Sequence, residues 1–107
     1  MNVMVLDKTV FNALVNKAVM EHFHDLFGPT TVKIIDSYLK RYDMSLEKTC
    51  DEPEKVSKAL HITFEDGANI LESEIVKAAY ETFKLKPKKF KDLGTALEML
   101  KDSARDL

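Results

Sequence analysis

The sequence has no tryptophan, a single cysteine and few aromatic residues of any kind. Six Phe and three Tyr are the only aromatics, so the core must consist mostly of Leu, Ile, Val, Ala and Met. The single cysteine, Cys50, excludes an internal disulfide and is typical of a reducing compartment. We therefore expect a cytoplasmic protein.

The chain also lacks long apolar runs. None approaches the roughly 18 residues that a membrane span needs. The apolar segment at residues 1–6 lacks a basic region and is shorter than the core of a signal peptide. We expect no membrane partner.

Charge and length are moderate. The net charge of −2 and the pI of about 5.9 provide no overall field that would attract the chain to nucleic acid or anionic lipid. Hydrophobic residues at 45% and charged residues at 32% are globular values. A chain of 107 residues predicts one domain over residues 1–107.

Apolar periodicity predicts a long first helix over residues 8–27. Its apolar residues fall in adjacent pairs that repeat every four residues and form one wide stripe. We expect Asp7 to be the N-cap, because its carboxylate can accept the free amides of the first turn. Gly28 and Pro29 then end the helix, since glycine accepts left-handed geometry and proline suits the first turn of the next helix. The stripe contains Val10, Phe11, Leu14, Val15, Ala18, Val19, Phe23, Leu26 and Phe27.

A second helix is expected over residues 29–42. Met44 and Leu46 then return to the core in a connector with one short helical turn. The predicted buried face of this helix contains Ile34, Ile35, Tyr38, Leu39 and Tyr42.

Three more helices are expected, from Pro53 to near Gly67, over residues 67–83 and over residues 92–105. Asp51 as N-cap, with Pro53 and Glu54, approximates a capping box. No apolar–polar alternation persists long enough for a strand. The early acids Glu72 and Glu74 suit the N-terminal dipole of the helix at 67–83. The predicted core positions of the three helices are Val56, Ala59, Leu60, Thr63 and Phe64; Leu71, Ile75, Ala78, Ala79, Tyr80 and Phe83; and Leu93, Ala96, Leu97, Leu100 and Ala104.

The fold class is therefore predicted as all-α, a compact bundle of about five helices with a long N-terminal helix and two helix pairs. The pairs align as a hypothetical internal repeat, against the alternative that any two amphipathic helix pairs align this well. The offset is 41 residues for the first helices and 37 for the second. Gly28 and Gly67 are the expected structural turns. The aligned positions are Ile34 with Ile75, Ile35 with Val76, Leu39 with Tyr80, Tyr42 with Phe83, Met44 with Leu85, and residues 56–60 with 93–97.

Histidines suggest metal binding only at first sight. His22 and His24 lie two residues apart and would point about 200° apart on a helix, so they cannot share one ion. We interpret both as surface histidines. His61 and Glu65 have the i, i+4 spacing, but two ligands do not make a site. We expect no metal and no cofactor.

Cys50 precedes the start of a predicted helix, where the helix dipole lowers a thiol pKa, but the neighbouring Asp51 and Glu52 act in the opposite direction. We interpret it as an ordinary loop or core thiol. The sequence has no Gly-rich phosphate loop, no nucleophile elbow and no paired ligands, so we expect no catalytic residues and no enzymatic activity. A small-molecule pocket would have to lie between the helix pairs, lined by His61, Tyr38 or Tyr80.

Five lysines without an intervening acid form a basic connector at residues 84–91. One interpretation is a solvated connector that complements the C-terminus of the preceding helix. The alternative is a contact for phosphate, nucleic acid or an acidic partner, although Phe90 is expected to face the core. The five are Lys84, Lys86, Lys88, Lys89 and Lys91.

The segment 28–41 is similar to the recognition helix of a helix-turn-helix motif. The preceding helix is longer than that motif uses, and the domain is acidic. Its outward residues would be Thr30, Thr31, Lys33, Ser37, Lys40 and Arg41.

Residues 53–85 resemble the archaeal Nitrosopumilus output-domain family. The matching positions are Pro53, Phe64, Gly67, Ala68, Ile70, Leu71, Glu72, Ile75 and Phe83. The chain departs from the family pattern at Phe-Glu-Asp-Gly, where Phe-Gly is expected. The resemblance implies a small helical unit with an output role beside sensory domains, and it implies no catalytic residues.

Together these observations predict a small non-enzymatic signalling or protein-interaction module. The apolar faces, especially on the first helix, exceed what a domain of this size can cover. We therefore expect a homodimer or another protein partner. The alternative is a nucleic-acid or anion binder that uses the lysine connector or the segment 28–41.

Overall fold

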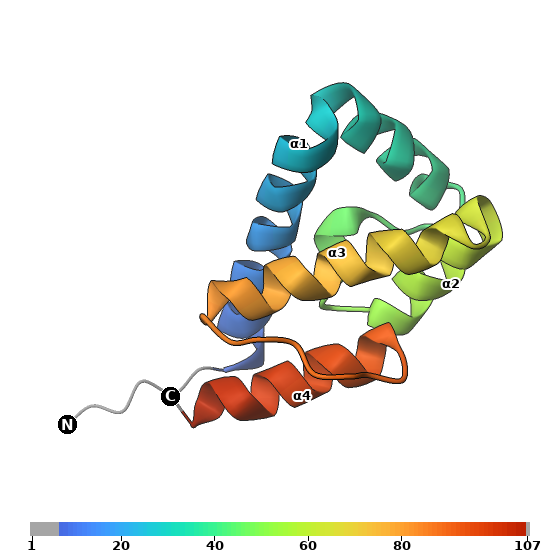
Figure 1. Cartoon of the computed structure of the whole chain (residues 1–107). Coiled ribbons are helices and arrows are strands. Elements are labelled where there is room, and N and C mark those ends of the chain that lie inside the picture. Colours follow the sequence, from blue (N-terminus) through green and yellow to red (C-terminus); the bar gives the residue numbers. More distant parts are fainter. Residues whose placement is uncertain (1–6, 107) are drawn as a thin grey trace.

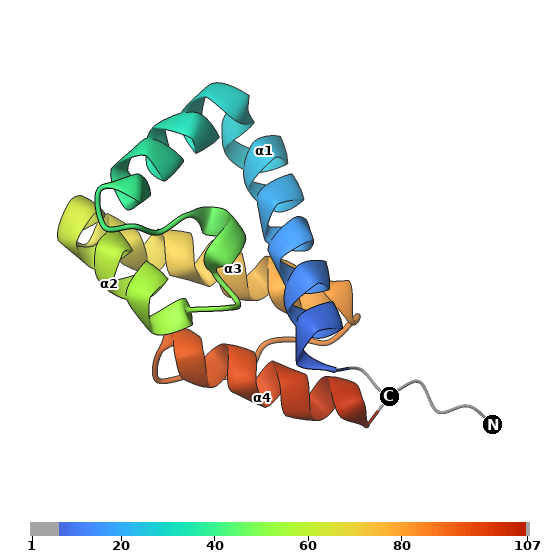
Figure 2. The same ribbon diagram turned by 180° about the vertical axis from the view of Figure 1, so that it is seen from behind.

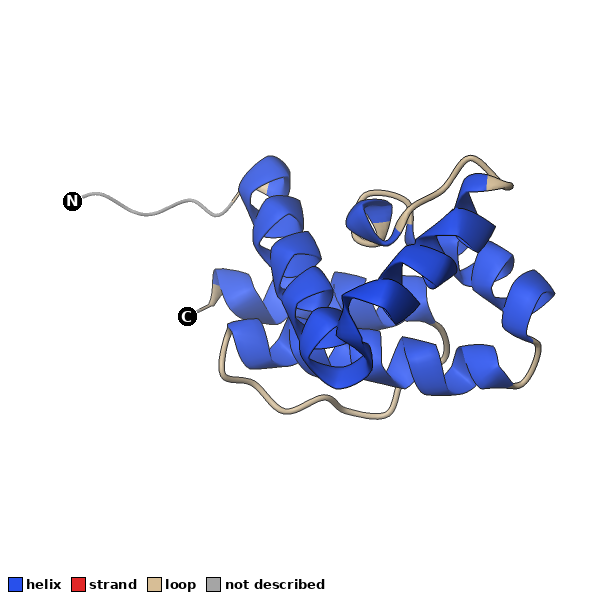
Figure 3. Ribbon diagram, turned by 90° about the horizontal axis from the view of Figure 1, so that it is seen from above, coloured by secondary structure: helices blue, strands red, loops and turns tan. Residues whose placement is uncertain are grey.

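The computed structural model describes residues 7–106, which form four α-helices and one short 3₁₀ helix (Figure 1). No strand occurs among these residues (Figure 3), so the all-α prediction is confirmed, while the count of about five helices is wrong by one. The apolar segment 1–6 lies outside the described residues. The elements are α1 (Lys8–Lys40), η1 (Leu46–Lys48), α2 (Pro53–Phe64), α3 (Gly67–Thr82) and α4 (Leu93–Arg105).

The helix expected over residues 29–42 is the second half of α1. The backbone at Gly28 (φ 84°, ψ 158°) is not helical, and only glycine takes this conformation at low cost. Pro29 follows and begins the next turn. We call residues 8–27 the first arm of α1 and residues 29–40 the second arm. Figure 2 shows the arms diverging from a kink at the top of the molecule, with α4 at the opposite end.

Of the two N-caps that the sequence predicted, the structure contains one. Asp7 accepts the amide of Val10 at 2.9 Å, as predicted. The expected capping box at Asp51 is wrong, because the N-cap of α2 is Glu52 and its side chain makes no capping hydrogen bond. Asp51 instead lies 3.4 Å from the amide nitrogen of Asn16 on the first arm, whose oxygen accepts the Cys50 amide at 2.8 Å. The contact of Asp51 with the distant Asn16 thus takes the place of the predicted capping bond.

Gly67 does not make the turn between α2 and α3. The residue with positive φ there is Glu65 (φ 51°), and Gly67 is the first residue of α3. Of the two glycines expected as structural turns, only Gly28 has a conformation that requires glycine.

One hydrophobic core joins all the helices, and the chain has a radius of gyration of 13.6 Å. Every predicted core position of α4 is buried, as are Met44 and Leu46. In α2, Val56, Ala59 and Leu60 are buried, whereas residues 63–64 are half-buried. Along α3 the predicted positions are also buried, except that Phe83 is half-buried. Within residues 7–106, no helix combines the length and apolar character needed to cross a membrane.

The predicted core faces of α1 are wrong at several positions. The periodicity shows which side is apolar, but the diverging arms leave part of that side without a neighbour. Val32, which the sequence did not single out, is buried in the second arm. The predicted core residues that are exposed instead are Val10, Leu14, Leu26, Ile34, Tyr38 and Tyr42.

Candidate functional site

Four large apolar side chains are exposed together where the second arm of α1 meets α2. Ile34, Tyr38, Tyr42 and Ile62 are 50%, 37%, 44% and 51% exposed. We call these four residues the tyrosine face. Tyr42 and Ile62 line the same shallow groove of about 220 Å³. The Tyr38 ring meets the half-buried ring of Phe64 on α2 edge to face, with centroids 5.9 Å apart. The face is therefore a continuous surface over two helices.

Helical geometry explains why this surface is apolar yet open. Ile34 and Tyr38 lie four residues apart and share a flank of the second arm. The adjacent flank, with Val32, Ile35 and Leu39, carries the buried contacts of the arm. Among residues 7–106, Tyr38 on this flank meets Phe64 of α2, and both Ile34 and Tyr38 stay partly exposed.

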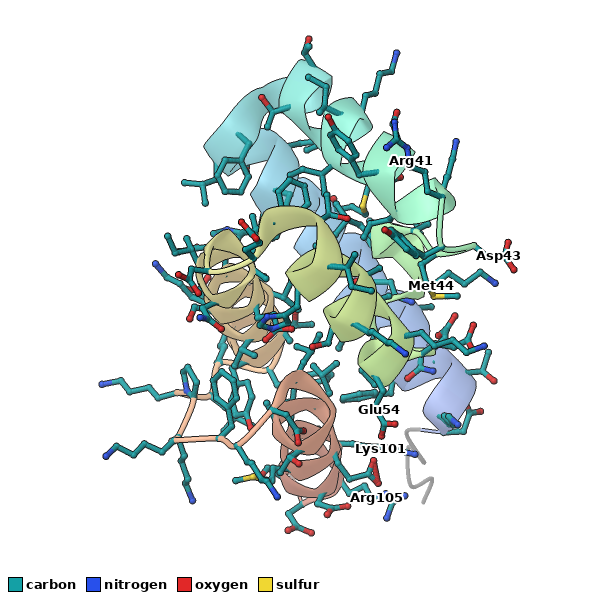
Figure 4. All side chains as sticks on the ribbon, turned by 90° about the vertical axis from the view of Figure 1, so that its right-hand side faces the viewer. Arg41, Asp43, Met44, Glu54, Lys101 and Arg105 are labelled. Atoms are coloured by element: carbon teal, nitrogen blue, oxygen red, sulfur yellow. The ribbon has the colours of Figure 1, made fainter. Side chains whose placement is uncertain are left out.

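Basic groups border the tyrosine face. The Arg41 guanidinium lies over the Tyr38 ring, 5.0 Å from its centroid, an exposed cation–π contact worth about 0.5–1 kcal/mol. Figure 4 shows Arg41 just after the end of the second arm, with the side chain of Asp43 set apart from it. Lys58 lines the groove beside Tyr42 and Ile62. Tyr and Arg are the residues that most often dominate protein interfaces.

The lysine connector forms the loop between α3 and α4. Its five lysines, Lys84, Lys86, Lys88, Lys89 and Lys91, are all exposed. Within residues 7–106, no carboxylate lies within ion-pair distance of them. Phe90 is half-buried against the core, as predicted, so it offers no platform for base stacking.

The outward positions expected for a helix-turn-helix are also exposed. The segment 28–41 continues from the first arm through the kink at Gly28. The exposed side chains are Thr30, Thr31, Lys33, Ser37, Lys40 and Arg41.

The histidines pair with distant carboxylates. His22, expected at the surface, is half-buried and its Nε2 lies 2.7 Å from Glu74 Oε1 on α3. His61 does not pair with Glu65; its Nε2 lies 3.2 Å from Glu72 Oε2. Both contacts link α3 to a neighbouring helix. The sequence missed them because the partners are far apart in the chain, and no local spacing indicates the pairing.

Glu72, whose charge we matched to the N-terminal dipole of its helix, is only 8% exposed. It accepts a short hydrogen bond from the Ser57 hydroxyl and contacts His61. In a catalytic triad the histidine stands between the nucleophile and the carboxylate. Here the Glu72 carboxylate stands between the serine and the histidine, so the three residues do not have the order of a triad.

Cys50 is buried, in agreement with its interpretation as an ordinary loop or core thiol. Burial, followed by the charge of Asp51, raises the pKa of the Cys50 thiol to about 12. A thiol with this pKa is neutral at physiological pH and a poor nucleophile.

A surface groove of about 710 Å³ runs between the first arm and the segment that precedes α2. It is open and lined mainly by polar side chains, and none of His61, Tyr38 and Tyr80 borders it. Tyr80 is buried and donates its hydroxyl to the carbonyl of Ala96 at 2.9 Å. The groove therefore differs from the pocket that the sequence suggested.

Within residues 7–106, no three His, Cys, Asp or Glu side chains are grouped closely enough to hold a metal ion. No family model, curated protein or solved structure matches the chain. The resemblance to the archaeal output-domain family therefore stays a prediction.

Proposed function

We propose that this chain is a small non-enzymatic protein-interaction module that works as a homodimer. The signalling-output role in the cytoplasm, which the family resemblance implies, is part of this proposal. The observation that carries it is the tyrosine face, a continuous apolar surface with an arginine stacked on one of its tyrosines. Tyr and Arg supply large contacts that a second protein surface can bury.

The expected strength of the dimer follows from the exposed areas. Each side chain of the face is about half exposed, so burying the remainder contributes ~1 kcal/mol per side chain. A two-fold symmetric dimer buries the tyrosine face of both copies. Four side chains in each of two copies give a gross ~8 kcal/mol before the cost of association is subtracted. A net ~8 kcal/mol would correspond to a Kd of about 1 μM. Since association itself costs ~4 kcal/mol or more, we expect a concentration-dependent dimer with a Kd between the micromolar and millimolar ranges.

Sedimentation equilibrium over micromolar to millimolar concentrations tests this proposal. The double variant Tyr38→Ala, Tyr42→Ala should weaken self-association at least tenfold. Lys40→Ala is the matched control, since Lys40 lies two residues from both tyrosines on the other side of the same arm. A wild-type chain that is strictly monomeric at millimolar concentration would contradict the homodimer.

The second candidate function is binding of nucleic acid or another polyanion. The specific observation in its favour is the group of five exposed lysines, none of which has a carboxylate within ion-pair distance among residues 7–106. Exposed residues of the segment 28–41 could extend such a surface. Fluorescence anisotropy with a labelled oligonucleotide at low salt should show salt-dependent binding that weakens in the triple variant Lys86→Glu, Lys88→Glu, Lys89→Glu. No anisotropy change with the wild-type chain excludes this candidate.

A further inference from the structure

The second arm of α1 and α3 end in the same hydrogen-bonded turn. In each, a residue with positive φ follows the helix, Asp43 (φ 60°) in one and Lys84 (φ 57°) in the other. Its amide donates to the carbonyl three residues earlier, and the next amide donates to the carbonyl five residues earlier, which is the Schellman motif. The four bonds, each 3.0 Å long, join Asp43 to Lys40, Met44 to Leu39, Lys84 to Glu81 and Leu85 to Tyr80.

The helices that follow these turns also correspond. The aligned positions of α2 and α4 are buried in both. The turn spacing of 41 residues equals the offset of the sequence alignment. The second arm with α2, and α3 with α4, therefore behave as two copies of one helix pair. The aligned buried residues are Val56, Ala59 and Leu60 in α2 and Leu93, Ala96 and Leu97 in α4.

The two pairs differ in one respect, the burial of the tyrosine face. Ile75, which corresponds to Ile34, is fully buried. Phe83, which corresponds to Tyr42, stacks on Phe11 of the first arm with ring centroids 5.5 Å apart. In the pair formed by α3 and α4, this face is thus covered by an amphipathic helix, the first arm of α1. In the other pair, no helix among residues 7–106 covers it.

The first arm has a second apolar surface that its own fold does not use. Val10 and Leu14, four residues apart, are 47% and 43% exposed and lie away from the buried side of this arm. We call these two residues the outer stripe. Glu21 and Asp25 continue the same side of the helix and are exposed. Lys17, which is exposed, lies on the same side between Leu14 and Glu21. The outer stripe is therefore apolar, with one basic residue and then two acidic residues beyond it.

We propose that, in the homodimer, the outer stripe of each copy packs on the tyrosine face of the other. The first arm then covers two helix pairs, its own through Phe11 and the partner copy's through Val10 and Leu14. Anchors at i and i+4 suit a helix laid in a shallow groove. Glu21 and Asp25, which lie beyond Lys17 on the first arm, would meet the basic border of the tyrosine face, Arg41 and Lys58. Because the contact forms twice about a two-fold axis, the dimer is closed.

This inference rests on the proposed homodimer, and a mixing experiment separates the two. Leu14→Glu disrupts the outer stripe and leaves the tyrosine face intact. Tyr38→Glu disrupts the tyrosine face and leaves the outer stripe intact. Each variant alone should associate at least tenfold more weakly than wild type. When they are mixed, one intact contact remains, between Leu14 of one chain and Tyr38 of the other. Native mass spectrometry should then detect heterodimers at concentrations where neither variant forms homodimers.

Each other outcome overturns a specific claim. If Leu14→Glu dimerises like wild type while Tyr38→Glu does not, the homodimer stands and the outer stripe is not its second surface. If both variants are monomeric and no heterodimer forms on mixing, the proposed pairing is wrong. If both variants dimerise like wild type, neither surface forms the dimer. Two control variants place the same charge beside these surfaces, Ala13→Glu beside the outer stripe and Lys40→Glu beside the tyrosine face. Each should leave the association constant within twofold of wild type.

A cross-linking measurement keeps the pairing testable if a glutamate variant does not fold. A chain with Leu14→Cys is mixed with a chain with Tyr38→Cys under mild oxidation. Disulfides between the two chains should form at least tenfold faster than disulfides between two Leu14→Cys chains. Buried Cys50, whose thiol pKa is raised to about 12, should not compete. Equal rates for the two pairings would contradict the proposed contact.

Discussion

Replacing Gly28 by alanine tests whether one backbone conformation sets the shape of α1. Gly28 has φ 84° and ψ 158°, a region that is essentially restricted to glycine. An added Cβ would have no neighbouring heavy atom within 4 Å. The whole effect of the substitution must therefore come from the backbone and not from crowding.

The magnitude follows from these two observations. Holding alanine in this conformation costs about 1–3 kcal/mol, and the stiffer unfolded chain offsets about 0.4–1 kcal/mol of that. We expect Gly28→Ala to lower the free energy of unfolding by roughly 1–2 kcal/mol. For a small domain, each kcal/mol lowers the Tm by about 4–8 °C.

Urea denaturation followed by circular dichroism measures this difference, with Gly67→Ala as the matched control. Gly67 is helical, and its added Cβ would lie 3.6 Å from the Cβ of Phe64, an ordinary contact. Alanine there should raise stability by about 0.4–1 kcal/mol. If Gly28→Ala is as stable as wild type, or if Gly67→Ala loses as much, the backbone of Gly28 does not determine the kink.

Three further predictions concern side chains. Glu72→Ala should lower the free energy of unfolding by about 1–3 kcal/mol, because it leaves a half-buried serine hydroxyl and a histidine without their shared acceptor. Thermal denaturation measures the loss, with Ser73→Ala as the control variant. Cys50 should react slowly with iodoacetamide at pH 8 in the native protein and rapidly in urea, and a fast native reaction would show that the thiol is accessible. Its pKa rises from 9.0 to about 12 on folding. The unfolded thiol therefore loses its proton first, and this group should reduce stability as the pH rises above 9. Asp92 caps α4, and the Thr95 amide lowers its pKa below 3.8. Its contribution to stability is present above its unfolded pKa and lost as the pH falls through the folded value, so the Tm difference between wild type and Asp92→Ala should shrink under acid conditions.

Much of the helical architecture was predictable, because its signals are local. Gly28-Pro29 breaks α1 where the sequence placed the break, since both residues restrict their own backbone. Pro53 begins α2 as predicted. The core residues of α4, and Val56, Ala59 and Leu60 of α2, were also correct, because helical spacing alone places them on one side of each helix.

The candidate site was predictable only in part. The sequence singled out three residues of the tyrosine face, Ile34, Tyr38 and Tyr42, but assigned them to the core. It did not single out the fourth, Ile62. Periodicity shows that a side of a helix is apolar, but it contains no information on whether another helix reaches that side. The partners of His22 and Glu72 were missed for the same reason, because contacts between distant residues depend on how helices pack.

The sequence by itself thus determined that the chain is helical, where its helices begin, and that α1 breaks at Gly28. Only the tertiary structure decided that Ile34, Tyr38 and Tyr42 face outward, whereas their counterparts in α3 are covered by the first arm of α1. The physical reason is that the two arms diverge at Gly28. The first arm covers one helix pair and leaves the tyrosine face of the other exposed.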